Sequence, residues 1–155
     1  MKVRRRLAVK IGSISWMPRY LPQIVLSDNA IQAVTGQRLS LLDIADLPNI
    51  TIKVPGRKSG VVRTTQLLAV PDGSDWLIAG SYFGSPKMPA WVYNVRAADE
   101  IEIVVHGETA AATATELTED ERTAAWQTLR AVWPNFDLYE QRTDRTIPVF
   151  RLRPR

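Results

Sequence analysis

The stretch from residue 50 to residue 70 constrains the fold of this chain most, because two strand-like segments flank a short glycine-bounded turn. Residues 50–54 alternate apolar and polar side chains at the two-residue period of a half-buried strand. Residues 64–70 resume a strand-like run after the turn. The sequence therefore predicts a β-hairpin near the middle of the chain.

The turn of this hairpin is strongly cationic. Arg57, Lys58 and Arg63 follow one another closely, and Gly56 and Gly60 bound its tip. Free backbone N–H groups combined with guanidinium and ammonium donors can hold a phosphate or a carboxylate. The alternative is a solvated basic turn without a ligand. We expect the turn to bind an anion.

A second loop, residues 79–91, is rich in Gly, Ser and Pro and leads into a predicted helix. Its small residues allow a flat ligand to approach the backbone, and Tyr82, Phe83 and Trp91 could cover the faces of that ligand. The alternative for Trp91 is a side chain that only fills the core. An anion-binding turn with an aromatic slot suggests a phosphorylated heteroaromatic cofactor.

Several different short motifs follow one another along the last two thirds of the chain. They are Gly56-Arg57-Lys58-Ser59-Gly60, Arg63-Thr64-Thr65, Ser81, Gly84, Lys87, Pro89, Trp91, Asn94 and Thr143-Asp144-Arg145-Thr146-Ile147-Pro148. This pattern resembles the deazaflavin-dependent nitroreductase family of actinobacteria, whose members use coenzyme F420, an 8-hydroxy-5-deazaflavin. Agreement of several motifs in order and spacing is more specific than any one of them.

The resemblance also implies which residues form the site. The cofactor-binding residues would be Arg57, Lys58, Ser59, Arg63, Thr64, Thr65, Gln66, Leu67, Leu68, Ala79, Gly80, Ser81, Tyr82, Lys87, Ala90, Trp91, Val92, Tyr93, Asn94 and Phe136. Tyr139 would be the catalytic residue that donates a hydrogen bond to the substrate. The alternative is that Tyr139 packs between helix and sheet with its hydroxyl satisfied there. This chain departs from the family's more common Lys-Gly at Tyr82 and Phe83.

The remaining segments predict an α+β fold with one domain over residues 1–155. Further strands are expected at residues 76–79, 101–106, 110–115 and 147–152, with helices at residues 27–34, 89–98 and 118–133. Thr118 and Glu121 fit a capping box at the start of the last helix. Pro148 is expected to restrict the last strand to an edge or a bulge. The resemblance implies a split β-barrel over residues 49–155, an architecture shared with flavin-mononucleotide-binding oxidases, which are typically dimers.

The N-terminal segment, residues 1–26, is basic and amphipathic but lacks the unbroken apolar run of a signal peptide or a spanning helix. We expect it to lie on an anionic membrane surface. The alternative is a helix packed across the domain with its charges solvated. The expected location is therefore the cytoplasm, with peripheral association at the inner face of the plasma membrane.

Composition excludes several classes of site. The chain has no cysteine, so disulfides, thiol catalysis and iron–sulfur clusters are excluded. Its single histidine, His106, ends a predicted strand and has no visible partners for a triad or a metal site. The net charge of +4 fits an acidic ligand or surface. Nucleic acid is the least favoured partner, because stacking aromatics do not alternate with the basic residues.

A deazaflavin carries the electrons itself, so the protein needs little acid–base machinery. We expect an F420H2-dependent oxidoreductase that transfers a hydride to a quinone-like, enone or other hydrophobic acceptor, as a monomer or a homodimer. One alternative is a non-catalytic protein that binds deazaflavin or a fatty acyl chain in the same pocket. A second alternative is a flavin-mononucleotide oxidase on the same barrel.

Overall fold

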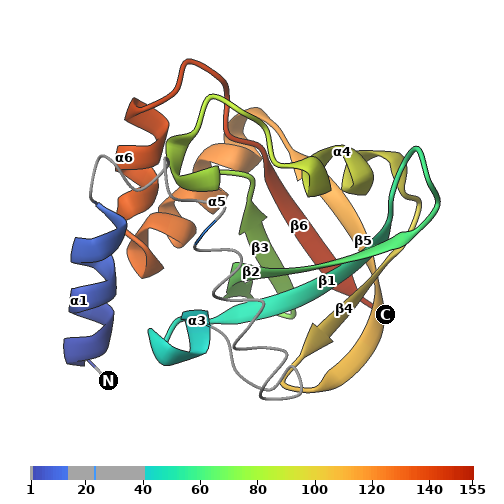
Figure 1. The fold of residues 1–155 in the computed structure, drawn as a ribbon, viewed down its shortest axis with the longest axis horizontal. Coiled ribbons are helices and arrows are strands. Elements are labelled where there is room, and N and C mark those ends of the chain that lie inside the picture. Colours follow the sequence, from blue (N-terminus) through green and yellow to red (C-terminus); the bar gives the residue numbers. More distant parts are fainter. Residues whose placement is uncertain (1, 14–22, 24–40) are drawn as a thin grey trace.

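A computed structural model of the chain describes residues 2–13, 23 and 41–155. Within these residues, six strands form a closed antiparallel barrel in the order β1-β2-β3-β6-β5-β4 (Figure 1). The strands are β1 (Asn49–Pro55), β2 (Val62–Asp72), β3 (Asp75–Ala79), β4 (Ile101–Val105), β5 (Glu108–Leu117) and β6 (Val149–Pro154). The helices are α1 (Lys2–Gly12), α3 (Leu41–Ile44), α4 (Ala90–Ala97), α5 (Glu119–Val132), α6 (Asn135–Gln141) and the short 3₁₀ helix η2 (Tyr82–Gly84). The predicted α+β barrel is confirmed.

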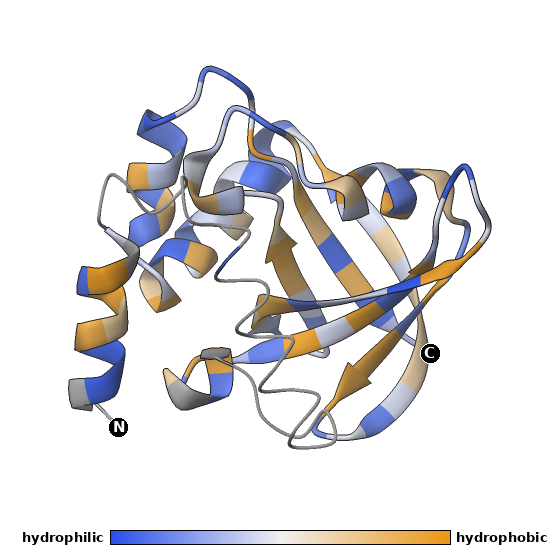
Figure 2. Cartoon of the chain, in the orientation of Figure 1, coloured by the Kyte–Doolittle hydropathy of each residue, from blue (hydrophilic) through white to orange (hydrophobic). Residues whose placement is uncertain are grey.

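The hairpin predicted from the alternating pattern is formed by β1 and β2. Ile52 lies opposite Thr65, and Val54 lies opposite Arg63. Along β1 the side chains of Ile50, Ile52 and Val54 are buried while their neighbours are not. Figure 2 shows the same alternation of hydrophobic and hydrophilic residues on the β1 ribbon. Sequence period, register and burial therefore agree in this hairpin.

Two apolar clusters pack on opposite faces of the strands. The interior cluster is lined by all six strands and closed by α4; it contains Ile50, Ile52, Val54, Ala69, Ile78, Trp91, Val92, Val95, Ile101, Ile103, Ala112, Phe150 and Leu152. The outer cluster lies where α5 and α6 cover the barrel; it contains Leu47, Val70, Leu77, Leu117, Ala125, Trp126, Leu129, Trp133, Phe136, Tyr139, Ile147 and Val149. Consecutive residues such as Leu77 and Ile78 belong to different clusters, as the pleat of a strand requires.

The end of the chain differs from the prediction. Strand β6 pairs with both β3 and β5, so it is a central strand and the predicted edge position is wrong. Pro148 is tolerated because it precedes the strand, where no ladder N–H is needed. Its carbonyl oxygen accepts a hydrogen bond of 2.9 Å from the Gly80 N–H. Helix α6 was not predicted from the sequence.

The capping box predicted at the start of α5 is also wrong. Thr118 is the N-cap residue and has the expected extended backbone, but its side chain makes no capping hydrogen bond. Glu119 follows in the left-handed region with φ of 48°. The backbone therefore leaves the geometry in which the hydroxyl of Thr118 reaches a free N–H of the first turn.

Helix α1 packs on α5 and α6 rather than standing apart from the domain (Figure 1). Arg5 donates to the carbonyl of Val132, at the end of α5. The side-chain amide of Asn135 donates to the carbonyl of Val9 at 2.6 Å. The described part of α1 thus fits the packed-helix alternative. The helix predicted at residues 27–34 lies outside the described residues, and no helix within them is long and apolar enough to cross a membrane.

Candidate functional site

The turn between β1 and β2 is closed by its own hydrogen bonds. The Gly56 N–H donates to Val61 O at 2.8 Å, and the Gly60 N–H donates to Gly56 O at 2.7 Å. The Val61 N–H donates to Ser59 Oγ at 3.2 Å. Gly60 has φ of 70°, a conformation that glycine adopts without strain. These three N–H groups are therefore not available to an anion, which corrects the prediction for them.

Helix α4 supports the turn from one side. The Arg57 N–H donates to Asn94 Oδ1 at 3.0 Å. The Arg57 guanidinium lies over the Tyr93 ring, 5.1 Å from its centroid, in a cation–π contact. The opposite face of α4 is buried through Trp91, Val92 and Val95. The structure thus brings Arg57, Tyr93 and Asn94 together and anchors α4 in the interior cluster.

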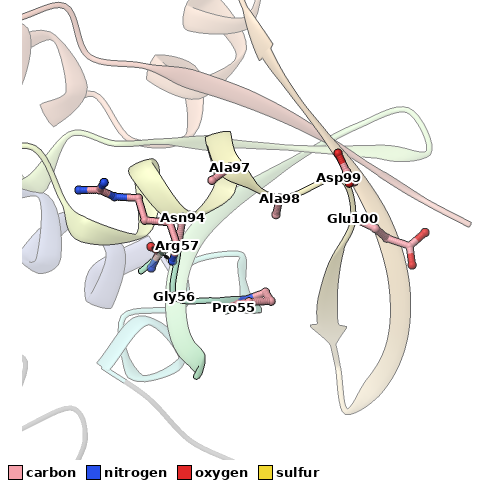
Figure 3. A pocket seen from close by; sticks show the side chains of 8 residues that line it. All are labelled: Pro55, Gly56, Arg57, Asn94, Ala97, Ala98, Asp99 and Glu100. Carbon is pink, nitrogen blue, oxygen red and sulfur yellow. Dashed lines mark hydrogen bonds between the residues drawn. The ribbon is translucent and has the colours of Figure 1, made fainter. Parts of the chain in front are cut away.

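A hollow of about 420 Å³ lies between the turn and the end of α4 (Figure 3). It is lined by Pro55, Gly56, Arg57, Asn94, Ala97, Ala98, Asp99 and Glu100. The two carboxylates lie in the figure on the side away from Arg57. Glu100 is paired with Arg155 at 2.9 Å, so the Asp99 carboxylate is the one that would repel an anion, and an anionic group fits better at the Arg57 end. Lys58, Arg63 and Trp91 do not line this hollow.

Four cations of the candidate site have no carboxylate partner. Arg57, Lys58, Arg63 and Lys87 are exposed, and none forms an ion pair with another residue of the described chain. Most other arginines of the barrel strands and α4 are paired, such as Arg96 with Glu116 at 2.6 Å. These four cations therefore place uncompensated positive charge on the hairpin turn and the loop after β3.

The loop after β3 has an uncommon backbone. Tyr82, Phe83 and Gly84 have φ of 45°, 54° and 76°, so three successive residues are left-handed. For residues with a side chain this costs about 1–2 kcal/mol each. The Gly84 N–H donates to Ser81 O, and the Ser85 N–H donates to Tyr82 O, both at 2.9 Å. Such a conformation persists only where its surroundings hold it.

Two arginines that the sequence did not single out hold this loop. Arg145 donates from Nε to Ser85 O and from Nη2 to Ser81 O, both at 2.9 Å. Arg142 donates from Nη1 to Phe83 O at 3.3 Å. The only sequence signal for Arg145 was its place in one of the motifs of the family resemblance. Its contact with the loop is visible only in the folded structure.

Tyr139 and Phe136 lie in the outer cluster and not beside the hairpin. Tyr139 is 2% exposed, and its hydroxyl accepts a hydrogen bond of 3.2 Å from Trp133 Nε1. Burial raises the pKa of Tyr139 to about 12, so the hydroxyl stays protonated at neutral pH. Phe136 is 3% exposed and packs edge-on against Tyr139. The burial of Tyr139 corrects its predicted contact with substrate and agrees with the packed alternative.

The other predicted site residues divide by burial. Trp91 is 9% exposed and packs against Phe150 with ring centroids 5.8 Å apart, so its ring fills the core instead of covering a ligand. Val92 and Gly80 are also buried. The accessible or half-buried ones are Ser59, Thr64, Thr65, Gln66, Leu67, Leu68, Ala79, Ser81, Tyr82 and Ala90. These residues and the four cations lie on the hairpin, the loop after β3 and the start of α4.

Known proteins match this chain in sequence and in fold. Residues 25–154 match the model of the F420H(2)-dependent quinone reductase family. An F420H(2)-dependent quinone reductase of Mycobacterium tuberculosis is 30% identical over 138 residues, which cover 86% of this chain and 93% of that relative. The solved F420-H2 dependent reductase FDR-A is 31% identical with a TM-score of 0.63, covering 68% of this chain and 93% of that one. Another solved structure, described as a domain-swapped dimer, is 28% identical with a TM-score of 0.65 and covers 80% and 94%. The chain belongs to the F420H2-dependent quinone reductase family.

Proposed function

We propose that this protein transfers a hydride from reduced coenzyme F420 to a quinone. The observation that carries the proposal is the family match over residues 25–154. The barrel supports it with a cluster of cations that pair with no carboxylate of the described residues, beside a half-buried loop, the chemistry that an acidic, flat cofactor requires. The enzyme itself supplies binding, orientation and exclusion of water.

The residues on the hairpin and on α4 fit such a cofactor. Arg57, Lys58 and Arg63 would hold its acidic groups, and Arg57 is pre-organised by its contacts with Tyr93 and Asn94. Tyr82, half-buried on the opposite loop, would face the ring system. When bound, reduced F420 supplies the hydride for the acceptor. The site needs no histidine or cysteine for this chemistry.

An acceptor assay tests the proposal. Purified protein with F420H2 and menadione is expected to regenerate oxidised F420, and reactions without protein or without menadione are the controls. Tight binding of F420 with no oxidation across quinones and enones would instead identify a non-catalytic binding protein. A copurified yellow flavin would identify a flavin-mononucleotide enzyme.

Replacement of Lys58 tests the role of the turn. Lys58→Ala is expected to weaken F420 binding by about 1.5–3 kcal/mol, the range for a hydrogen bond to a charged group, and by the lower end because the side chain is exposed. Fluorescence titration with F420 measures the change. Lys53→Ala is the matched control, since Lys53 lies on β1 but pairs with Glu102 at 2.7 Å. Equal affinities of the Lys58 variant and the parent would remove the turn from the cofactor site.

We also propose that α1 associates peripherally with an anionic membrane. Leu7 and Ile11 are 59% and 46% exposed on one side of α1, among the exposed cations Arg4, Arg6 and Lys10. Apolar and basic groups together bind anionic lipid surfaces. Replacing both Leu7 and Ile11 by serine is expected to lower co-sedimentation with phosphatidylserine vesicles about tenfold or more. The proposal would be contradicted if parent and variant sedimented equally with phosphatidylserine vesicles, or if the parent sedimented as well with neutral vesicles as with anionic ones.

A further inference from the structure

We infer that Arg145 is a positioning residue for hydride transfer, because its guanidinium holds the loop of residues 81–85, with its left-handed residues 82–84, beside the proposed cofactor site. This inference rests on the proposed function. It concerns a residue that acts through the loop and does not itself need to touch the cofactor.

The loop requires an external restraint. Tyr82 and Phe83 both carry side chains that disfavour positive φ, and no regular element continues on either side of η2. The two hydrogen bonds within the loop close two overlapping four-residue turns, and bonds of this kind form in turns of either handedness. The restraint must therefore come from residues packed on the loop.

Arg145 provides this restraint at both ends of the left-handed segment. Ser81 O precedes Tyr82 and Ser85 O follows Gly84, and each lies 2.9 Å from a nitrogen of the same guanidinium. A third nitrogen approaches Met88 Sδ at 3.6 Å. The planar guanidinium thus fixes the separation of the two carbonyls, which a single ammonium group cannot do equally well.

The electrostatics are consistent with a positioning role. Arg145 is half-buried, and among the described residues it pairs with carbonyl oxygens rather than with a carboxylate. Burial lowers the pKa of Arg145 from its usual range, while the nearby Tyr93 opposes that shift. Carbonyl partners leave its positive charge uncompensated, so this charge adds to that of the hairpin cations. Removing a cation from water costs free energy, which a side chain that only filled space would not recover.

The chain offers a matched control in Arg122. This arginine is also half-buried and donates two hydrogen bonds to one carbonyl, Ile147 O, at 3.1 and 2.9 Å. It stacks on Trp126 and lies on α5, away from the loop. Arg122→Met removes these two bonds and an ion pair of 3.5 Å with Glu140, and among the described residues Arg122 donates no hydrogen bond to residues 81–85.

The experiment compares Arg145→Met, Arg145→Lys and Arg122→Met with the parent protein. In the cofactor-free proteins, amide hydrogen exchange at Gly84 and Ser85 should be at least about tenfold faster in Arg145→Met than in the parent. Opening of the loop breaks the hydrogen bonds that these two N–H groups donate. The Kd for F420 and the KM for F420H2 should rise about 10- to 100-fold, with a smaller fall in kcat. The Kd and KM of Arg145→Lys should lie between those of the parent protein and those of Arg145→Met. Added methylguanidinium should partly restore F420 binding by Arg145→Met. Arg122→Met should lower the unfolding midpoint and leave the Kd unchanged.

Three results would overturn the inference. They are unchanged exchange at Gly84 and Ser85, an unchanged Kd despite faster exchange, and a rise in Kd in Arg122→Met equal to that in Arg145→Met. If exchange accelerates in Arg145→Met but the parent protein binds no F420, the proposed function fails while the loop restraint stands.

Discussion

Phe150→Ala is expected to lower the free energy of unfolding by about 3–5 kcal/mol, because it deletes a large buried ring. Phe150 is 1% exposed, is the second residue of β6 and packs against Trp91 of α4. Alanine would remove most of a large ring from between the barrel and the helix that supports the site. Since domains of this size are stable by about 5–15 kcal/mol, the variant would be close to unfolding.

Urea unfolding followed by tryptophan fluorescence measures this loss, and Phe150→Leu is the matched control. Leucine keeps most of the buried apolar volume, so its cost should be no more than about 1.5 kcal/mol. Similar losses for the alanine and leucine variants would show that the volume of the ring is not what stabilises this part of the barrel.

Gly84→Ala is expected to cost about 2–4 kcal/mol, through backbone strain and a steric clash together. The φ of Gly84 is 76°, and an added Cβ would lie 2.7 Å from Tyr139 O and 2.8 Å from Arg142 Cβ. Relief of this clash requires the loop to move away from α6, which would also pull Phe83 from the Tyr139 ring. We therefore expect weaker F420 binding together with the lower stability.

Gly73→Ala separates the strain from the clash. Gly73 is also left-handed, with φ of 64°, but an added Cβ would meet no atom within 4 Å. Its cost should be limited to the strain, about 1 kcal/mol, without an effect on F420 binding. Unfolding midpoints and F420 titrations of the two variants give the comparison. Equal costs at Gly84 and Gly73 would mean that the contact between loop and α6 contributes nothing.

The strands could be predicted because their signals are local. Alternation over residues 50–54 followed from side chains that point to opposite faces, and the structure confirms it in β1. Helix α6 could not be predicted in the same way. It is seven residues long, and its buried Asn135, Phe136 and Tyr139 pack against α5 and the barrel, a face that exists only after folding.

The sequence located the cationic turn and the loop after β3, because glycine, serine and basic residues mark such segments wherever they pack. It misjudged side chains whose surroundings come from distant parts of the chain. Trp91 and Tyr139 are apolar rings with a polar edge, equally suited to a ligand or to a core, and the fold buries both. The N–H groups of the turn were likewise predicted to be free, although those of Gly56, Gly60 and Val61 form hydrogen bonds within the turn.

By itself the sequence determined the β-hairpin, its positive charge and the positions of the strands along the chain, since these depend on neighbouring residues. Only the tertiary structure decided that Arg145 spans the ends of a loop sixty residues before it in the chain. It also decided that β6 closes the barrel between β3 and β5. Both depend on contacts between segments far apart in sequence, whose positions are set when the two apolar clusters form and not by any local pattern.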